Sequence, residues 1–364
     1  MRGCPAYLYH ISQRACPDWL RLYHDKTATM KTILIPVDYS PGSTSALLYG
    51  LKMARKAHLE VVVLHAFYSV ISPPAAYDVP FFISELEAEK TRELEKYVKE
   101  SLNAPTDELI FRYSCAKFTE EGEEPVPFRA PPYHTVAVEE VTHKSYAAHV
   151  TCLAKMGSVY EQTKAAAEAY GVNLIVMGLQ GVGATLGNAL IGSTTLSLMR
   201  SCPVPVLGVP PKAIYSDLKK VVFATDLRKQ PDRQQLADLR GFVSTFRSML
   251  QVLHIDREQD LPAVYIEVQG ALSVLDRALY DVEYKVILQH RKKVAAGIQE
   301  YLQAHKVNLL ILGPRHHSFL DKLLHASVTA TMVGDSLFPL LTLPETHTPG
   351  HPGAEDEMEN TQGY

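Results

Sequence analysis

Short apolar runs alternate along the chain with segments in which apolar residues recur every three or four positions. The run KTILIPVD at residues 31–38 is apolar at successive positions, as expected of a parallel strand buried on both faces. After it, Ser40 and Pro41 are typical of a helix N-cap and first turn, and an apolar stripe follows at helical spacing. This alternation of strands and helices predicts a parallel sheet covered by helices, with right-handed crossovers.

The same sequence of landmarks occurs twice. KTILIPVD is matched by KKVVFATD, EVVVLHAF by MLQVLHID, VNLIVMG by VNLLILG, and CPVPVLGVP by SLFPLLTLP, always in this order. In the first half we expect strands at 31–38, 60–67, 150–156, 172–177 and 202–210, and helices at 83–102, 158–171 and from 192 onward. In the second half we expect helices at 233–246, 265–279, 294–305 and 320–333, and a third strand at 282–288. The predicted fold class is α/β, with two tandem doubly wound five-stranded parallel sheets, each in the strand order 3-2-1-4-5.

These repeats set the expected domain boundaries. Residues 30–211 form the first domain, which contains an insertion at 103–149, and residues 218–345 form the second. The acidic, proline-rich part of the insertion predicts an exposed loop or flap. Residues 1–29 are expected to be an N-terminal extension, either disordered or not translated because Met30 is the working start. The polar tail at 346–364 is expected to be disordered.

Composition narrows the functional classes. The net charge of −4 over 364 residues gives no basic field for nucleic acid. No apolar run reaches the length of a membrane span. Five scattered cysteines form no CxxC pair, which favours a reducing compartment. We therefore expect a cytoplasmic protein that acts on neither nucleic acid nor membrane.

The glycine-rich stretch GLQGVGATLGNALIGST at 178–194 is the main candidate site, because it follows the fourth strand. Strands 1 and 4 flank the switch point of such a sheet, where ligands bind. Gly178 and Gly181 would let the backbone approach a ligand, and Gly192, Ser193 and Thr194 open a helix whose N–H groups suit phosphate. Asp38, at the end of strand 1, could bind a ribose hydroxyl or a phosphate-bound Mg²⁺. A structural reading stays open, in which the glycines permit tight packing and Asp38 is an N-cap.

Other nucleotide-site motifs are absent. GVGATLG is GxGxxxG rather than GxGxxG, and no Walker P-loop, HIGH or SGGxDS motif occurs. No nucleophile–base pair lies beside the site, so at most slow ATP hydrolysis is expected. An enzyme of the adenine nucleotide α-hydrolase-like class ranks last among the alternatives.

These motifs resemble the universal stress protein family in its tandem-domain form. The resemblance rests on IPVDYS and on the signature Gly-x2-Gly-x9-Gly-Ser/Thr, although ten residues separate Gly181 from Gly192 here. It implies an adenine nucleotide alpha hydrolase-like fold and, as in some members, binding of ATP or a related adenine nucleotide such as AMP or ADP, with Mg²⁺ held through the phosphates. The residues it places at the nucleotide are Pro36, Val37, Asp38, Ala66, Met177, Gly178, Gly181, Gly192, Ser193 and Thr194.

The second half departs from this signature. Gly313 is retained, but His316 and Ala326 replace the other two glycines, so this half is expected to bind no ATP. The adjacent histidines at 316 and 317 fit an exposed turn better than a metal site, since metal ligands must converge. His65 and His254 recur in both halves and are expected to be structural.

The resemblance also implies that the fifth strands of the two domains pair within one chain, which leaves further homodimerisation open. The function expected is that of a cytoplasmic stress-response regulator that binds an adenine nucleotide in its first domain and acts on an unknown protein partner. The alternative is a nucleotide-free scaffold or interaction protein of the same fold.

Overall fold

The computed structural model describes residues 7–9, 30–69, 79–102, 109–112, 148–180, 191–211, 213–257, 261–313 and 338–344. Gly181, most of the insertion, the helix expected at 320–333, the histidines at 316 and 317, and the tail lie outside these ranges. In the first half the elements are β2 (Thr32–Pro36), α2 (Pro41–Ala57), β3 (Glu60–Phe67), α3 (Val79–Ser101), β4 (Leu109–Arg112), β5 (Ala148–Met156), α4 (Val159–Ala169), β6 (Leu174–Gly178), α5 (Ser193–Ser201) and β7 (Val206–Val209).

The second half repeats the pattern, and one strand precedes both halves. The elements are β8 (Lys220–Ala224), α6 (Arg233–Phe246), β9 (Met249–Asp256), α7 (Leu261–Glu267), α8 (Gln269–Ala278), β10 (Tyr284–His290), α9 (Val294–His305), β11 (Leu309–Leu312) and β12 (Leu340–Thr342), with β1 at Tyr7–Tyr9. The single helix expected at 265–279 is two helices, α7 and α8. Within each half the strand order is confirmed: β5-β3-β2-β6-β7 and β10-β9-β8-β11-β12 both read 3-2-1-4-5.

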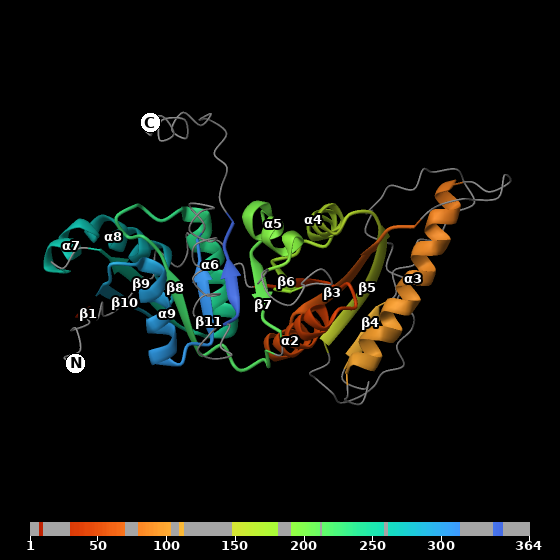
Figure 1. Ribbon diagram of the computed structural model, residues 1–364, viewed down its shortest axis with the longest axis horizontal. Coiled ribbons are helices and arrows are strands. Elements are labelled where there is room, and N and C mark those ends of the chain that lie inside the picture. The colour runs from red at the N-terminus through yellow and green to blue at the C-terminus, as the bar shows by residue number, and fades with distance from the viewer. Residues whose placement is uncertain are drawn as a thin grey trace, which may run out of the picture.

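The two halves share one mostly parallel twelve-stranded sheet, instead of forming two separate sheets (Figure 1). The fifth strands β7 and β12 pair antiparallel, with Leu341 opposite Leu207. The Thr342 hydroxyl donates a hydrogen bond to the Val206 carbonyl at 3.3 Å. The expected pairing of the fifth strands within one chain is therefore present.

Each half gains an edge strand that the sequence reading did not predict. β4 lies in the insertion, ahead of the part that was expected to be a loop, and it pairs parallel with β5. β1 lies in the N-terminal extension and pairs antiparallel with β10 of the other half. An edge strand leaves a row of unpaired backbone groups, so any suitable apolar segment lowers the free energy by joining it.

The core consists of two apolar layers, one on each face of the sheet. Helices α2, α3, α6 and α8 pack on one face and α4, α5 and α9 on the other. Alternate strand residues supply the layers: Ile33 and Ile35 lie in the first and Leu34 in the second, all fully buried. The first layer runs without a break through residues of both halves.

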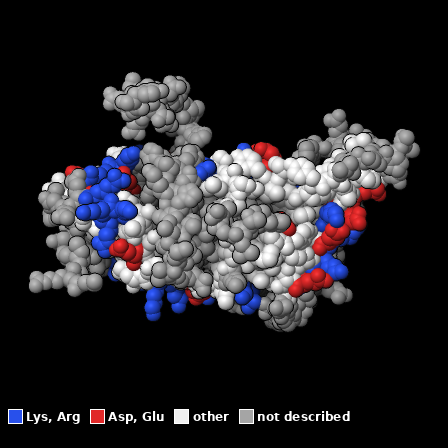
Figure 2. All heavy atoms as spheres, in the orientation of Figure 1, with Lys and Arg blue, Asp and Glu red and all other residues white. Residues whose placement is uncertain are grey.

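Helix α3 caps the edge strand β5 beyond the four residues of β4. The Glu87 carboxylate accepts hydrogen bonds from the Met156 N–H at 3.1 Å and from the Lys155 ammonium at 2.6 Å. The Thr91 hydroxyl accepts the Ala154 N–H at 3.1 Å. The outer face of α3 carries both acidic and basic side chains (Figure 2).

No helix in the described part of the chain is both long enough and apolar enough to cross a membrane.

Candidate functional site

Hydrogen bonds join the carboxyl ends of β2 and β3 at Val37, the residue before Asp38. The Val37 N–H donates to the Leu64 carbonyl at 2.8 Å. The Val37 carbonyl accepts a hydrogen bond from Nδ1 of His65 at 3.0 Å, which places the proton on Nδ1 because a carbonyl can only accept. His65 thus has the structural role expected for it, and it holds the first two strand ends in register.

The end of β6 and the start of α5 are also joined. The Gly192 N–H donates to the Leu179 carbonyl at 2.7 Å. The buried Thr195 hydroxyl donates to the Gly178 carbonyl at 3.0 Å. The two ends of the glycine-rich stretch therefore lie side by side, as a strand–loop–helix phosphate site would require.

Gly178 has a packing role that the sequence reading left as one of its alternatives. A Cβ at Gly178 would stand 2.6 Å from the Gly42 carbonyl oxygen and 3.1 Å from the Ser43 nitrogen. A Cβ at Gly42 would stand 1.8 Å from the carbonyl oxygen of Gln180. The missing side chain at Gly178 is thus explained by the close approach of α2, and not by a ligand.

Gly192 is different, because its backbone does not need a glycine. It is the N-cap of α5 with φ −63° and ψ 143°, a conformation open to any residue, and no side chain caps the helix. Helices α2 and α4 of the same half are capped by the Ser40 and Ser158 hydroxyls. Among the described residues, the N-cap of α5 therefore supplies no side-chain acceptor to the first turn of the helix.

Asp38 is exposed and lies in a turn at the start of α2. Its Oδ1 accepts the Ser40 N–H at 3.1 Å, and the Ser40 hydroxyl in turn accepts the Ser43 N–H at 3.1 Å. The N-cap is therefore Ser40, while Asp38 holds the turn that precedes it. A hydrogen bond of the same kind occurs in the second half, where Asp226 Oδ1 accepts the Arg228 N–H at 3.0 Å.

The other residues expected at the nucleotide lie around the same edge of the sheet. Pro36 and Met177 are buried at the ends of β2 and β6, and Ala66 is half-buried near the end of β3. Ser193 is exposed and Thr194 half-buried in the first turn of α5. The structure thus places the predicted residues at neighbouring strand ends, apart from Gly181, which is outside the described ranges.

In the second half, the equivalent strand ends hold a cluster of charged side chains. Nδ1 of His254 lies 3.2 Å from the Leu227 nitrogen and 3.3 Å from the Thr225 carbonyl oxygen, and its Nε2 lies 3.1 Å from the Asp256 carboxylate. Arg228 forms an ion pair with Asp256 at 2.9 Å and with Glu267 at 3.3 Å. Both His254 and Asp256 are buried, so a network of charged side chains occupies the strand ends of the second half.

Gly313 in the second half also lies close to a helix. A Cβ there would stand 2.6 Å from Oε1 of Gln235, a buried side chain in the first turn of α6. This contact is with the end of a flexible side chain, whereas the contact at Gly178 is with backbone, so packing requires glycine less strictly at Gly313. The replacements His316 and Ala326 lie outside the described residues, so the expectation that this half binds no ATP stays a prediction.

An aromatic cluster beside Asp38 was not foreseen from the sequence. The Tyr39 ring lies with its centroid 4.4 Å from that of His65 and 4.8 Å from that of Tyr97. Burial, followed by the charge of Glu93, raises the pKa of Tyr39 to about 12. Tyr97 comes from α3, far along the chain, so sequence spacing gave no signal for this contact.

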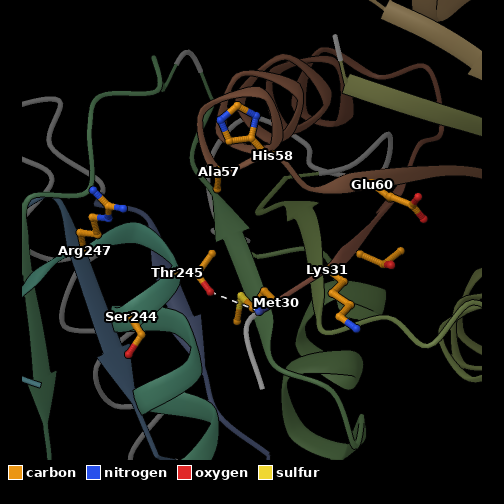
Figure 3. Close-up of a pocket in the computed structure, with 9 residues that line it drawn as sticks. Met30, Lys31, Ala57, His58, Glu60, Ser244, Thr245 and Arg247 are labelled. Carbon is orange, nitrogen blue, oxygen red and sulfur yellow. Dashed lines mark hydrogen bonds between the residues drawn. The ribbon is translucent and has the colours of Figure 1, made fainter. Parts of the chain in front are cut away.

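The described part of the chain also has a groove of about 640 Å³ at the amino ends of β2 and β3, the opposite end from the predicted site. Met30 forms part of it, and its N–H donates to the Thr245 hydroxyl of the second half at 3.2 Å. Figure 3 shows Arg247 on one side and Lys31 and Glu60 on the other, spread around the groove and not converging on one point. No group of three or more potential metal ligands occurs among the described residues.

Comparison with known proteins agrees with this architecture. The model of the universal stress protein family matches residues 29–210, which is half of the chain. Universal stress protein Slr1230 of Synechocystis sp. is 24% identical over 170 residues, a match that covers 47% of this chain and 57% of that relative. The crystal structure of a universal stress protein from Archaeoglobus fulgidus shares the fold at a TM-score of 0.53 and 17% identity, over 86% of this chain and 98% of its own. The chain belongs to the universal stress protein family.

Proposed function

We propose that the first domain binds ATP or a related adenine nucleotide, such as AMP or ADP, and that the protein is a cytoplasmic stress-response regulator. The observation that carries the proposal is the start of α5. Gly192 has no side chain, its conformation does not require glycine, and no side chain of the described residues caps the helix start. Such a helix start favours a phosphate as its acceptor.

Each predicted residue has a role that fits its position. The N–H groups of Ser193 and Thr194 would bind phosphate, and their hydroxyls would add hydrogen bonds. Asp38 would meet a ribose hydroxyl or a phosphate-bound Mg²⁺ with the carboxylate that also holds the turn. The backbone near Val37 and Ala66, at the ends of β2 and β3, would meet the base.

The test compares wild type with Gly192→Arg and Ser197→Arg. Gly192→Arg places a bulky side chain at the proposed phosphate position, whereas Ser197→Arg adds the same charge on the exposed face of the same helix. Wild type and Ser197→Arg should co-purify with an adenine nucleotide in mass spectrometry and bind ATP with Mg²⁺ in calorimetry. ATP at 100 times its Kd should stabilise both by about 2.7 kcal/mol. Gly192→Arg should show neither effect.

A nucleotide-free scaffold is the second candidate, and two contacts favour it. Gly178 is explained by packing against Gly42, and a hydrogen bond like the one that Asp38 accepts occurs at Asp226. Both are structural reasons for residues that also belong to the nucleotide signature. A wild-type protein that carries no nucleotide and shows no ATP-dependent melting shift would exclude the first candidate and favour this one.

A further inference from the structure

Tyr39 has a backbone conformation that its place in the fold does not explain. Its φ is +61°, and the other described non-glycine residues with positive φ are His58, Arg247 and Lys306. Those three are the C-caps of α2, α6 and α9, where left-handed backbone is common. Tyr39 precedes a helix. A bulky residue keeps this conformation only when its surroundings hold it there.

Contacts of the Tyr39 ring with neighbouring aromatic side chains hold the backbone in this conformation. The ring lies against His65 of β3 with the ring planes 46° apart and against Tyr97 of α3 edge-on at 90°. The Tyr97 hydroxyl is 2.6 Å from the Thr44 hydroxyl of α2. His65 also stacks on Phe67, at 6.1 Å between centroids. These spacings are those of favourable aromatic pairs. The Tyr39 ring therefore contacts two elements, β3 and α3, and its partner Tyr97 is bonded in turn to α2.

The same cluster reaches the residues of the proposed site. His65, which contacts the Tyr39 ring, donates through Nδ1 to the Val37 carbonyl. Asp38 and Ser40 flank Tyr39 in the chain and are joined by the turn hydrogen bond. A shift of the Tyr39 ring would therefore move both the Asp38 carboxylate and the start of α2.

The second half shows that the fold does not need this arrangement. Leu227 stands at the place of Tyr39, and its φ is not positive. Asp256 stands at the place of Phe67, and His254 contacts its carboxylate through Nε2, whereas His65 stacks on the Phe67 ring. The hydrogen bond at Asp226 persists without any aromatic cluster. The cluster is therefore associated with the half that keeps the signature glycines, and not with the fold.

We propose that Tyr39 is a positioning residue: its ring, held by His65 and Tyr97, fixes residues 37–40 in the shape that presents Asp38 to the ribose of the nucleotide. This inference rests on the proposed function. It predicts that removal of the ring loosens the loop and lowers discrimination among ribose variants, while phosphate binding at Gly192 persists.

The test uses the full chain and two variants of one residue. Tyr39→Gly adopts left-handed backbone readily and removes only the ring anchor. Tyr39→Phe retains the ring contacts and is the matched control. Calorimetry with Mg²⁺ measures affinity for ATP, 2′-deoxy-ATP and 3′-deoxy-ATP. Hydrogen exchange of residues 37–44 without nucleotide measures the loop itself.

Tyr39→Gly should bind ATP about threefold to tenfold more weakly, the fold-change that corresponds to loss of an aromatic pair. It should lose the preference for ATP over the deoxy analogues, and its loop should exchange faster, while Tyr39→Phe should match wild type. Tyr39→Asn, which also tolerates left-handed backbone, repeats the test if the glycine variant does not fold.

Wild-type exchange or wild-type ribose discrimination in Tyr39→Gly would overturn the inference and leave the proposed function standing. Absence of ATP binding in wild type would instead overturn the proposed function. Failure of the inference is therefore measured on Tyr39→Gly, and failure of the proposed function on wild type.

Discussion

At the scale of single residues, the signature glycines divide into two kinds. Gly178 is required by the backbone of α2, whereas Gly192 has a backbone conformation open to any residue and, as N-cap, offers α5 no side-chain acceptor. The sequence signature does not distinguish these two glycines. The structure distinguishes them through the backbone contact at Gly178 and the dihedral angles at Gly192.

The packing role of Gly178 gives a stability prediction. Gly178→Ala should lower the free energy of unfolding by about 1–3 kcal/mol, because its Cβ would meet the backbone of Gly42, which cannot rotate away. Gly270→Ala is the control. No atom lies within 4 Å of its Cβ position in α8, so helix propensity should raise stability by up to about 1 kcal/mol. Chemical denaturation checks both, and equal behaviour of the two variants would contradict the packing assignment.

Asp238 gives a prediction about pH. Burial raises the pKa of its carboxyl to about 6, a hydrogen bond from Gln234 opposes the shift, and Asp232 adds to it. Because the folded pKa is above the usual value, the folded state binds the proton more tightly, and stability falls as the pH rises from about 4 to 6. Asp238→Asn should therefore raise the melting temperature at pH 7.5 and leave it nearly unchanged below pH 4. An equal change at both pH values would contradict this reading.

At the scale of elements, α3 acts as a substitute for a neighbouring strand. Its Glu87 and Thr91 side chains accept backbone N–H groups of β5 that no strand pairs. This explains how a charged helix can protect the edge of a parallel sheet, where unpaired backbone groups favour aggregation.

Glu87→Ala should expose that edge. Loss of the acceptor for the Met156 N–H should destabilise the protein by about 1–3 kcal/mol and speed hydrogen exchange at Met156. Glu93→Ala removes an exposed pair with Lys90 on the same helix and should cost no more than about 1 kcal/mol. If both variants exchange alike at Met156, α3 does not cap the strand.

At the scale of the whole molecule, the two halves form one structural unit. The β7–β12 pairing makes one sheet, and one apolar layer continues through residues of both halves. A chain built from two copies of one pattern therefore need not behave as two independent domains.

We expect one cooperative unfolding transition for the full chain. Leu341→Asp, which places a charge at a fully buried position of the joint, should lower the melting temperature of residues in both halves together. Circular dichroism and hydrogen exchange resolved by half measure this. Two separate transitions, with only the second half affected by Leu341→Asp, would show that the halves unfold independently.

The sequence alone determined most elements and their order, apart from β1, β4 and the division of one expected helix into α7 and α8. A continuous apolar run predicted β3 at 60–67 and a period-3.6 pattern predicted α6 at 233–246, both with their observed bounds. The internal repeat with the family resemblance predicted the strand order and the β7–β12 pairing. These features follow from the order of apolar and polar residues within short segments, which can be seen directly in the sequence.

The tertiary structure decided what depends on contacts between distant residues. The packing of Gly178 against Gly42, the contact of Tyr39 with Tyr97, and the Arg228–Asp256 pair all join separate elements. No spacing in the sequence encodes such distances, because they are set by how helices pack on the sheet. The chain thus specifies where a nucleotide crevice would lie, and the packed molecule specifies which of its residues are there for the fold.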